Sequence, residues 1–214
     1  MDQAQAMDRM YRYQRYIYDL TRKYYLFGRD TLIRRMEIKV GDQVLEMGCG
    51  TARNLLLLAR RYPQTDFYGI DASHEMLHTA LTKIKARTYA QHVVLKQCLA
   101  ESVTYQQTFN LTRPFDVVFF SYSLSMIPPW REALQAGLDN LKTGGYLYIV
   151  DFSDQRQFPV WFRHLLTRWL NWFGVHYKVE LLTYLHALHN QGGGKLSIEG
   201  LGGHYAFLAE FQKT

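Results

Sequence analysis

The stretch that most constrains the fold of this chain runs from residue 43 to residue 59 and reads QVLEMGCGTARNLLLLA. Its start is typical of a buried strand, and residues 52–59 contain good helix formers rather than alternating apolar and polar residues. Gly48 and Gly50 permit backbone angles that other residues avoid, and they let a ligand approach the main chain closely. The amides that open the helix can then face that ligand. We therefore expect a strand, a ligand-binding glycine turn and a helix in succession.

Two classes of ligand compete for such a turn. A dinucleotide site favours G-x-G-x-x-G, but the position of the third glycine is occupied by Arg53. Glu46 stands two residues before the first glycine, and its carboxylate would repel a pyrophosphate, which disfavours a nicotinamide oxidoreductase. Glu46 suits a cationic ligand instead. The segment E-x-G-x-G-T resembles the first motif of the class I S-adenosylmethionine (SAM)-dependent methyltransferases, and this resemblance implies SAM as cofactor.

The remaining chain alternates predicted strands and helices. Strands are expected at 43–47, 66–71, 93–96, 115–120 and 146–151, and helices at 8–38, 73–87, 130–141, 158–173 and 179–190. A glycine stop at 142–145 is expected to end the helix 130–141. Residues 195–201 and 205–211 read as a closing strand pair. This rhythm predicts one domain over 1–214 with a doubly wound, mainly parallel sheet. The resemblance implies a Rossmann-like α/β methyltransferase fold with seven strands and an antiparallel last strand.

Asp71 ends the second predicted strand about 20 residues beyond the glycine turn, where an acid can accept hydrogen bonds from ribose hydroxyls. Ser73 is the expected N-cap of the following helix. Many related enzymes have Asp at the position of Leu99, so a backbone contact to the adenine is expected there instead. The cofactor-binding residues that the pattern and the resemblance imply are Tyr25, Arg29, Glu46, Gly48, Cys49, Gly50, Asp71, Ala72, Met76, Leu99, Ala100 and Ser121.

The composition limits the possible partners. Lys and Arg number 25 against 19 Asp and Glu, which gives a net charge of +6, and the chain contains 16 Tyr, 12 Phe and 4 Trp. A basic, aromatic-rich surface can meet nucleic acid or an anionic membrane. The sequence lacks an NPPY-like tetrapeptide after the fourth strand, which argues against a nucleic-acid methyltransferase. The two cysteines show neither disulfide nor metal-ligand spacing, so we expect a reducing compartment and no metal. Neither a signal peptide nor a membrane-spanning segment is expected.

Residues 156–176 contain three Trp, together with Phe, Leu and three Arg. On a helix, an apolar face that includes Leu165, Leu166 and Trp169 would oppose a basic one, as in helices that lie in a membrane interface. A core-facing helix has the same composition. We expect this segment to form an amphipathic lid that contacts the membrane, and residues 1–38 to form a helical cap.

The segment YRYQRYIYDLTRKYYLFGRD, residues 11–30, resembles the N-terminal signature of bacterial betaine-lipid methyltransferases. The resemblance spans essentially the whole chain. It implies successive N-methylation of diacylglyceryl-homoserine at the cytoplasmic face of the inner membrane, with a partner enzyme that supplies the homoserine lipid. Phosphatidylethanolamine N-methylation, quinone C-methylation and a non-catalytic SAM-binding module at the membrane surface remain alternatives.

The acceptor site is expected to need no dedicated base, because a crevice with little water disfavours the protonated amine. Tyrosine faces can hold the cation that methylation creates, and an arginine can hold the homoserine carboxylate. The candidates for these two tasks are Tyr18, Tyr25, Tyr122, Tyr148, Arg29 and Arg163.

Overall fold

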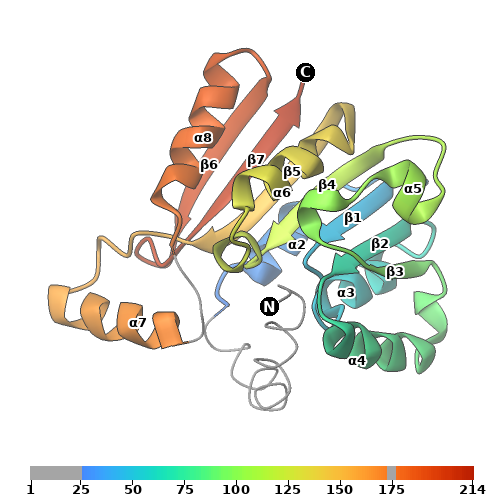
Figure 1. Cartoon of the computed structure of the whole chain (residues 1–214), viewed down its shortest axis with the longest axis horizontal. Coiled ribbons are helices and arrows are strands. Elements are labelled where there is room, and N and C mark those ends of the chain that lie inside the picture. The colour runs from blue at the N-terminus through green and yellow to red at the C-terminus, as the bar shows by residue number, and fades with distance from the viewer. Residues whose placement is uncertain (1–25, 173–176) are drawn as a thin grey trace.

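The computed structural model describes residues 26–172 and 177–214, which are organised around one seven-stranded sheet (Figure 1). The strand order is β3-β2-β1-β4-β5-β7-β6, and β7 alone runs antiparallel to its neighbours β5 and β6. This arrangement confirms the expected fold class. The strands are β1 (Gln43–Met47), β2 (Asp66–Asp71), β3 (Val93–Gln97), β4 (Phe115–Ser121), β5 (Leu141–Phe152), β6 (Gly194–Leu201) and β7 (Ala206–Lys213).

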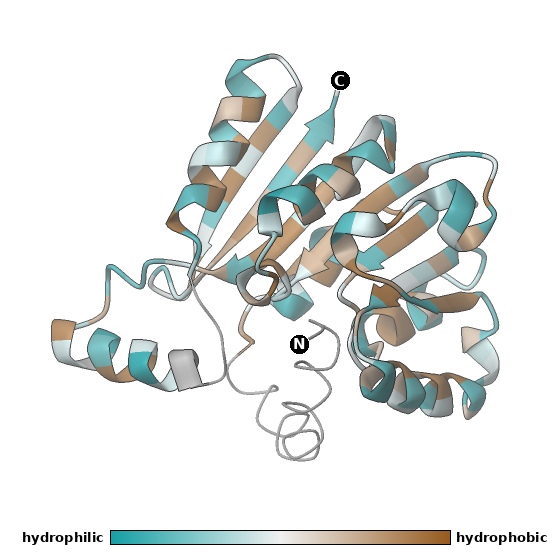
Figure 2. Cartoon of the chain, in the orientation of Figure 1, coloured by the Kyte–Doolittle hydropathy of each residue, from teal (hydrophilic) through white to brown (hydrophobic). Residues whose placement is uncertain are grey.

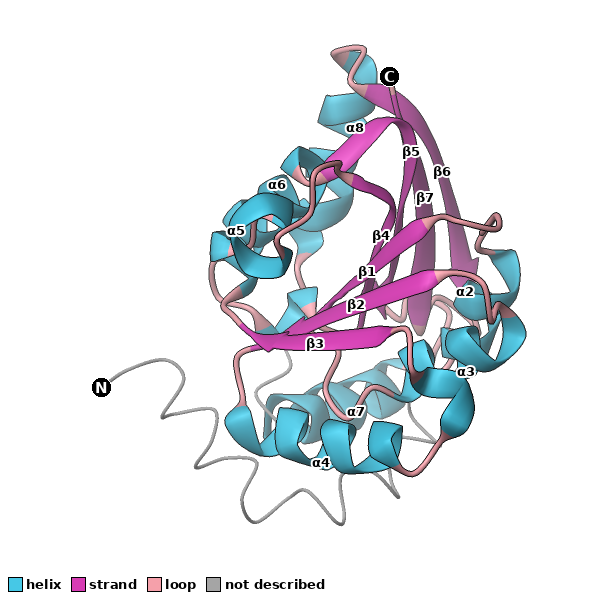
Figure 3. Ribbon diagram, turned by 90° about the vertical axis from the view of Figure 1, so that its right-hand side faces the viewer, coloured by secondary structure: helices cyan, strands magenta, loops and turns pink. Residues whose placement is uncertain are grey.

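Helices cover both faces of the sheet (Figure 3). Helices α2, α3 and α4 contribute to the core on one face, and α5, α6 and α8 pack on the other. Figure 2 shows the central strands as mainly apolar, whereas β6, β7 and the helices mix apolar and polar positions. The helices are α2 (Arg29–Arg35), α3 (Arg53–Arg61), α4 (His74–Lys85), α5 (Tyr105–Phe109), α6 (Trp130–Asp139), α7 (Val160–Trp172) and α8 (Val179–Asn190).

Strand β4 shows why the carboxyl ends of the strands define the site. Its residues Phe115 to Phe120 are all buried, as a strand with helices on both faces requires. It pairs in parallel with β1 on one side and β5 on the other. The carboxyl ends of β1, β2 and β4 therefore lie at the same edge of the sheet, where a doubly wound fold binds its ligand.

The expected glycine stop at 142–145 is wrong. Helix α6 ends at Asp139, and Asn140 caps it by donating from its side-chain amide to the carbonyls of Ala136 and Val103. Strand β5 has already begun at Leu141, and Gly144, with φ of 76°, lies inside it. The pairing with β4 shifts register here, so the glycines form an irregularity in the ladder rather than a helix terminus.

The two segments expected to flank the fold are only partly described. Of the helical cap 1–38, residues 1–25 lie outside the described part, and α2 confirms the helix after Gly28. Helix α7 divides its apolar residues, contrary to the expected single face. Leu166 and Trp169 pack against the core, whereas the Leu165 side chain is 62% exposed. No helix in the described ranges is both long and apolar enough to span a bilayer.

An ion cluster around Asp116 connects the start of β4 to its surroundings. The Asp116 carboxylate accepts hydrogen bonds from the Gln43 amide and from Arg113, each at 2.7 Å, and it pairs with Lys142 at 2.5 Å. Burial alone would raise the pKa of this carboxyl. The hydrogen bonds from Lys142, Gln43 and Arg113 outweigh burial and hold the pKa below its ordinary value.

We predict that Asp116→Asn lowers the free energy of unfolding by about 2 kcal/mol at neutral pH, because a charged acceptor of several hydrogen bonds is lost. The native pKa of Asp116 lies below the unfolded value of about 3.9. The difference between wild type and variant should therefore be complete above that value and disappear as the pH falls through the native pKa. Urea unfolding from pH 7 to pH 3 measures it. Asp139→Asn, at an exposed position, is the control and should change stability by less than about 0.5 kcal/mol.

Candidate cofactor-binding site

The glycine turn between β1 and α3 is fixed by hydrogen bonds to the end of β2. The amides of Gly48 and Cys49 both donate to the carbonyl of Ile70, at 2.9 and 2.8 Å. The amide of Gly50 donates to Asp71 Oδ2 at 2.8 Å, and Asp71 Oδ1 accepts from the Ser73 amide at 2.9 Å. The turn and the Asp71 carboxylate are thus held in one rigid unit.

Gly48 is required for two independent reasons. Its φ is 79°, a left-handed conformation that side chains disfavour, and a Cβ there would lie 2.7 Å from Ser123 Cβ. Ser123 belongs to the loop after β4, and its hydroxyl donates to the Met47 carbonyl at 2.7 Å. The loop after β4 therefore closes tightly over the glycine turn.

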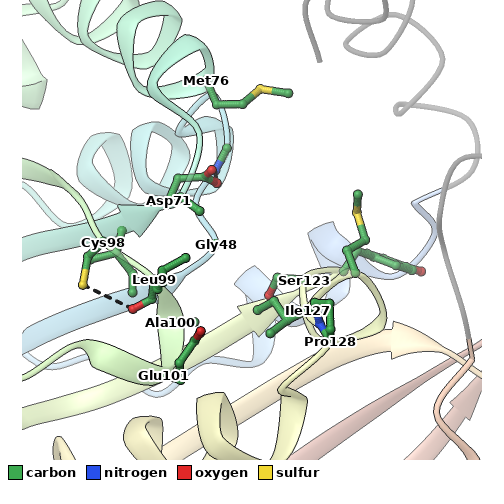
Figure 4. A pocket seen from close by; sticks show the side chains of 15 residues that line it. Gly48, Asp71, Met76, Cys98, Leu99, Ala100, Glu101, Ser123, Ile127 and Pro128 are labelled. Carbon is green, nitrogen blue, oxygen red and sulfur yellow. Dashed lines mark hydrogen bonds between the residues drawn. The ribbon is translucent and has the colours of Figure 1, made fainter. Parts of the chain in front are cut away.

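Two clefts open on either side of Gly48. The first has a volume of about 640 Å³, its mouth included, and its lining is mainly apolar. Figure 4 shows Met76 and Asp71 on one wall, Leu99 and Ala100 on a second, and Ser123, Ile127 and Pro128 opposite. The predicted cofactor residues that line this cleft are Gly48, Gly50, Asp71, Ala72, Met76, Leu99 and Ala100.

The second cleft is more polar and contains the predicted residues Arg29, Glu46, Gly48, Cys49 and Ser121. The Glu46 side chain is buried, and its Oε1 accepts a hydrogen bond from the side-chain Nδ2 of Asn54 at 2.7 Å. Burial, followed by the nearby charges of Asp71 and Glu46, raises the pKa of the Cys49 thiol well above its usual value. The Cys49 thiol is therefore neutral at physiological pH.

These features fit SAM. A carboxylate at the end of β2 matches a ribose diol, and the apolar first cleft matches an adenine ring. Glu46 matches a ligand that carries an ammonium and a sulfonium, and Arg29 can hold a ligand carboxylate. No group of three metal-binding side chains occurs within residues 26–172 and 177–214.

The residues predicted to bind the methyl acceptor lie in different places. Tyr18 and Tyr25 lie outside the described residues. Tyr122 lines the first cleft, and its hydroxyl donates to the Phe27 carbonyl. Arg163 is half-buried on α7 and lines neither cleft.

The prediction for Tyr148 is wrong. Its side chain is fully buried within β5, four residues before the strand ends, and its hydroxyl accepts a hydrogen bond from the Glu37 amide at 3.2 Å. The alternation of side chains along a strand turns this ring into the core beneath α2, away from both clefts.

Sequence reasoning missed several residues of the site. Thr51, Arg53 and Asn54, which follow the second glycine, line the second cleft, and Glu101 lines the first. Asp151, an acid at the end of a predicted strand, was not singled out either, but it lines neither cleft. It is buried, and it accepts hydrogen bonds from the amides of Ser125 and Phe152. Burial raises its pKa to about 6 despite these bonds.

The pattern of the methyltransferase-domain family matches residues 13–192, and the chain belongs to that family. Its cofactor is S-adenosylmethionine. A demethylmenaquinone methyltransferase from Anoxybacillus flavithermus is 29% identical over 133 residues, which cover 62% of this chain and 53% of that protein. The ubiquinone/menaquinone biosynthesis C-methyltransferase UbiE from Geotalea daltonii is 27% identical over 154 residues, covering 69% and 63%. The chain spans about half the length of the first of these relatives.

Solved structures share the fold at low sequence identity. The YcgJ protein from Bacillus subtilis superposes with a TM-score of 0.64 at 16% identity, covering 87% of this chain and 97% of that one. Phosphoethanolamine N-methyltransferase 2 from Haemonchus contortus, in complex with S-adenosyl-L-methionine, gives a TM-score of 0.69 at 14% identity, covering 87% and 52%. These similarities establish the fold.

We predict that Gly48→Ala abolishes measurable binding of S-adenosylhomocysteine (SAH), because the new methyl group meets Ser123 and distorts the turn. Gly144→Ala is the matched control, since Gly144 has nearly the same φ and no atom within 4 Å of its Cβ position. Both variants should lose about 1–2 kcal/mol from the left-handed backbone, but Gly144→Ala should bind SAH normally. Calorimetric titration and urea unfolding separate the two effects. Normal SAH binding by Gly48→Ala would disprove the close contact.

We predict that Asp71→Asn weakens SAH binding by about 10- to 100-fold, because a neutral acceptor replaces a charged one at the ribose position. Asp66→Asn, at the opposite end of the same strand, is the control and should leave the affinity unchanged. Equal affinities for the two variants would show that Asp71 does not contact the ligand.

Proposed function

We propose that the chain methylates the amine of a membrane lipid, with diacylglyceryl-homoserine as acceptor and the trimethyl betaine lipid as final product. The observation that carries the lipid part of this proposal is helix α7. Its side chains Val160, Trp161 and Leu165 are 60%, 70% and 62% exposed, and an exposed apolar helix that includes a Trp is typical of a membrane interface. The resemblance of residues 11–30 to betaine-lipid methyltransferases supports the homoserine head group.

The chemistry requires a deprotonated amine beside the cofactor, which supplies an electrophilic methyl group on a sulfonium. The lone pair of the acceptor nitrogen forms a bond to the methyl carbon while the carbon–sulfur bond breaks, and the nitrogen then loses its proton to water before the next round. A cleft with little water disfavours the ammonium form of the acceptor, so no side-chain base is required. Holding both reactants in line can lower the barrier by about 7 kcal/mol.

The residues of this chain have defined tasks in the proposal. Asp71 would hold the ribose, and Glu46 and Arg29 would hold the charged ends of the amino-acid part. Tyr122 lines the first cleft. Its ring is fixed by the hydrogen bond from its hydroxyl to the Phe27 carbonyl and by an edge-to-face contact with Phe152, whose ring centroid lies 4.7 Å away. A fixed tyrosine ring can stabilise the methylated cation by about 0.5–2 kcal/mol. Tyr18 and Tyr25 remain predictions for the same role, as does α7 for the role of lid.

Quinone C-methylation is the second candidate, because curated relatives at 27–29% identity carry that activity in their names. Both candidates have an amphipathic acceptor dissolved in a membrane. Phosphatidylethanolamine N-methylation is a further alternative, and a non-catalytic SAM-binding module is the alternative of a different class. The proposal also includes a position on the cytoplasmic face of the membrane, a partner enzyme that supplies the homoserine lipid, and no nucleic-acid partner.

Purified protein and SAM, incubated with vesicles that contain diacylglyceryl-homoserine, phosphatidylethanolamine or a demethylquinol, distinguish these alternatives by product mass. We expect mass increases of one, two and three methyl groups on the homoserine lipid alone. Methylation of the quinol alone would replace the proposal with the second candidate. SAH binding without any methylated product would support the non-catalytic module. The Asp71→Asn variant serves as the control for cofactor-dependent transfer.

A further inference from the structure

Helices α3 and α4 form a basic groove that the cofactor site does not explain. The groove has a volume of about 610 Å³ and is lined by four cationic side chains, Arg53 and Arg60 from the α3 side and Lys83 and Arg87 from the α4 side. Leu57 and Tyr89 also line it, and the Leu57 side chain is 40% exposed. No carboxylate belongs to the described lining of this groove.

The helical spacing explains why the cations gather there. Arg53 and Arg60 are seven residues apart, which places them on the same side of α3 two turns apart. Lys83 and Arg87 are four residues apart, and Arg87 Nη1 donates to the Lys83 carbonyl at 2.6 Å. Residues 51–65 and 76–90 together contain six Lys and Arg and no Asp or Glu. Lys83 and Arg87 repel each other at this spacing, whereas Arg53 is paired with Asp30 at 2.9 Å. An anion placed between the helices would offset the repulsion.

The apolar surroundings indicate which anion this is. Exposed leucines occur on both helices: Leu57 lines the groove, and Leu81 of α4, 43% exposed, lies outside its lining. Helix α7 packs through Leu166 and Trp169 against the same core as α3 and α4. Figures 1 and 3 both place α4 and α7 toward the lower side of the molecule as drawn. A nucleic-acid backbone gains little from exposed leucines, whereas a bilayer of anionic phospholipids offers both phosphate groups and an apolar interior.

We propose that the groove of Arg53, Leu57, Arg60, Lys83 and Arg87 binds the head groups of anionic phospholipids and orients the protein on the membrane together with α7. This extends the proposed function and rests on it for the choice of a membrane as partner. Arg53 and Lys83 also line the second cofactor cleft. The groove therefore continues into the cofactor site, and a lipid surface seated on it lies near the place where the acceptor must arrive.

The test uses Arg60→Gln/Arg87→Gln, because these two residues line the groove and neither cofactor cleft. Arg131→Gln/Lys195→Gln, at exposed positions on α6 and β6, removes the same charge elsewhere and is the matched control. Co-sedimentation with vesicles of phosphatidylcholine, with or without phosphatidylglycerol, gives the partition coefficients. Calorimetric titration with SAH confirms that each variant is folded.

We expect the groove variant to bind phosphatidylglycerol vesicles about 30-fold more weakly than wild type, because each of the two removed cations contributes about five- to sixfold near an anionic surface. The control should lose no more than a few-fold, and the difference should shrink at high salt. Equal binding by the groove variant and the control would overturn the proposal. It would also be overturned if the groove variant lost affinity for a single-stranded oligonucleotide but not for the vesicles. If the groove variant binds the vesicles more weakly than wild type but the wild-type protein methylates no lipid amine, the groove proposal is supported and the proposed function is wrong.

Discussion

The structure depends on the hydrogen bonds that join the glycine turn after β1 to the end of β2 and to the loop after β4. The Gly48 and Cys49 amides share the Ile70 carbonyl, the Gly50 amide binds the Asp71 carboxylate, and the Ser123 hydroxyl reaches the Met47 carbonyl. Because these bonds connect three neighbouring strands, they fix the walls of both clefts at once. The chain can then present Asp71 and Glu46 to a ligand without a separate rearrangement.

Acidic and basic side chains are separated around the glycine turn. Both carboxylates that face the cofactor clefts near the turn are held by fixed donors, Glu46 by the Asn54 side chain and Asp71 by the amides of the turn. The cations between α3 and α4 lie outside this pair of acids, in the groove that shares only Arg53 and Lys83 with the second cleft. The cofactor site and the proposed membrane contact therefore use surfaces of opposite charge on neighbouring parts of one fold.

The sequence predicted the strands and most helices well, because glycine turns and buried strands have strong local signals. Most of the predicted cofactor residues line the two clefts, and their contact with the cofactor stays a prediction. Ser73 was expected as an N-cap, and its hydroxyl does accept from the Met76 amide. The failures have tertiary causes. The end of α6 is set by side-chain bonds of Asn140 to a distant loop, and the burial of Tyr148 depends on strand alternation beneath α2. The basic groove was not predicted, because its cations come from two helices that only the fold brings together.

We interpret the acid-flanked glycine turn as the binding site of a positively charged methyl donor. Crystals grown with S-adenosylhomocysteine test this interpretation most directly. We expect the adenine between Met76 and Leu99, the ribose hydroxyls on Asp71 and the amino-acid part beside Glu46 and Arg29. Clefts that stay empty at saturating ligand, or that accept a dinucleotide pyrophosphate instead, would contradict the account.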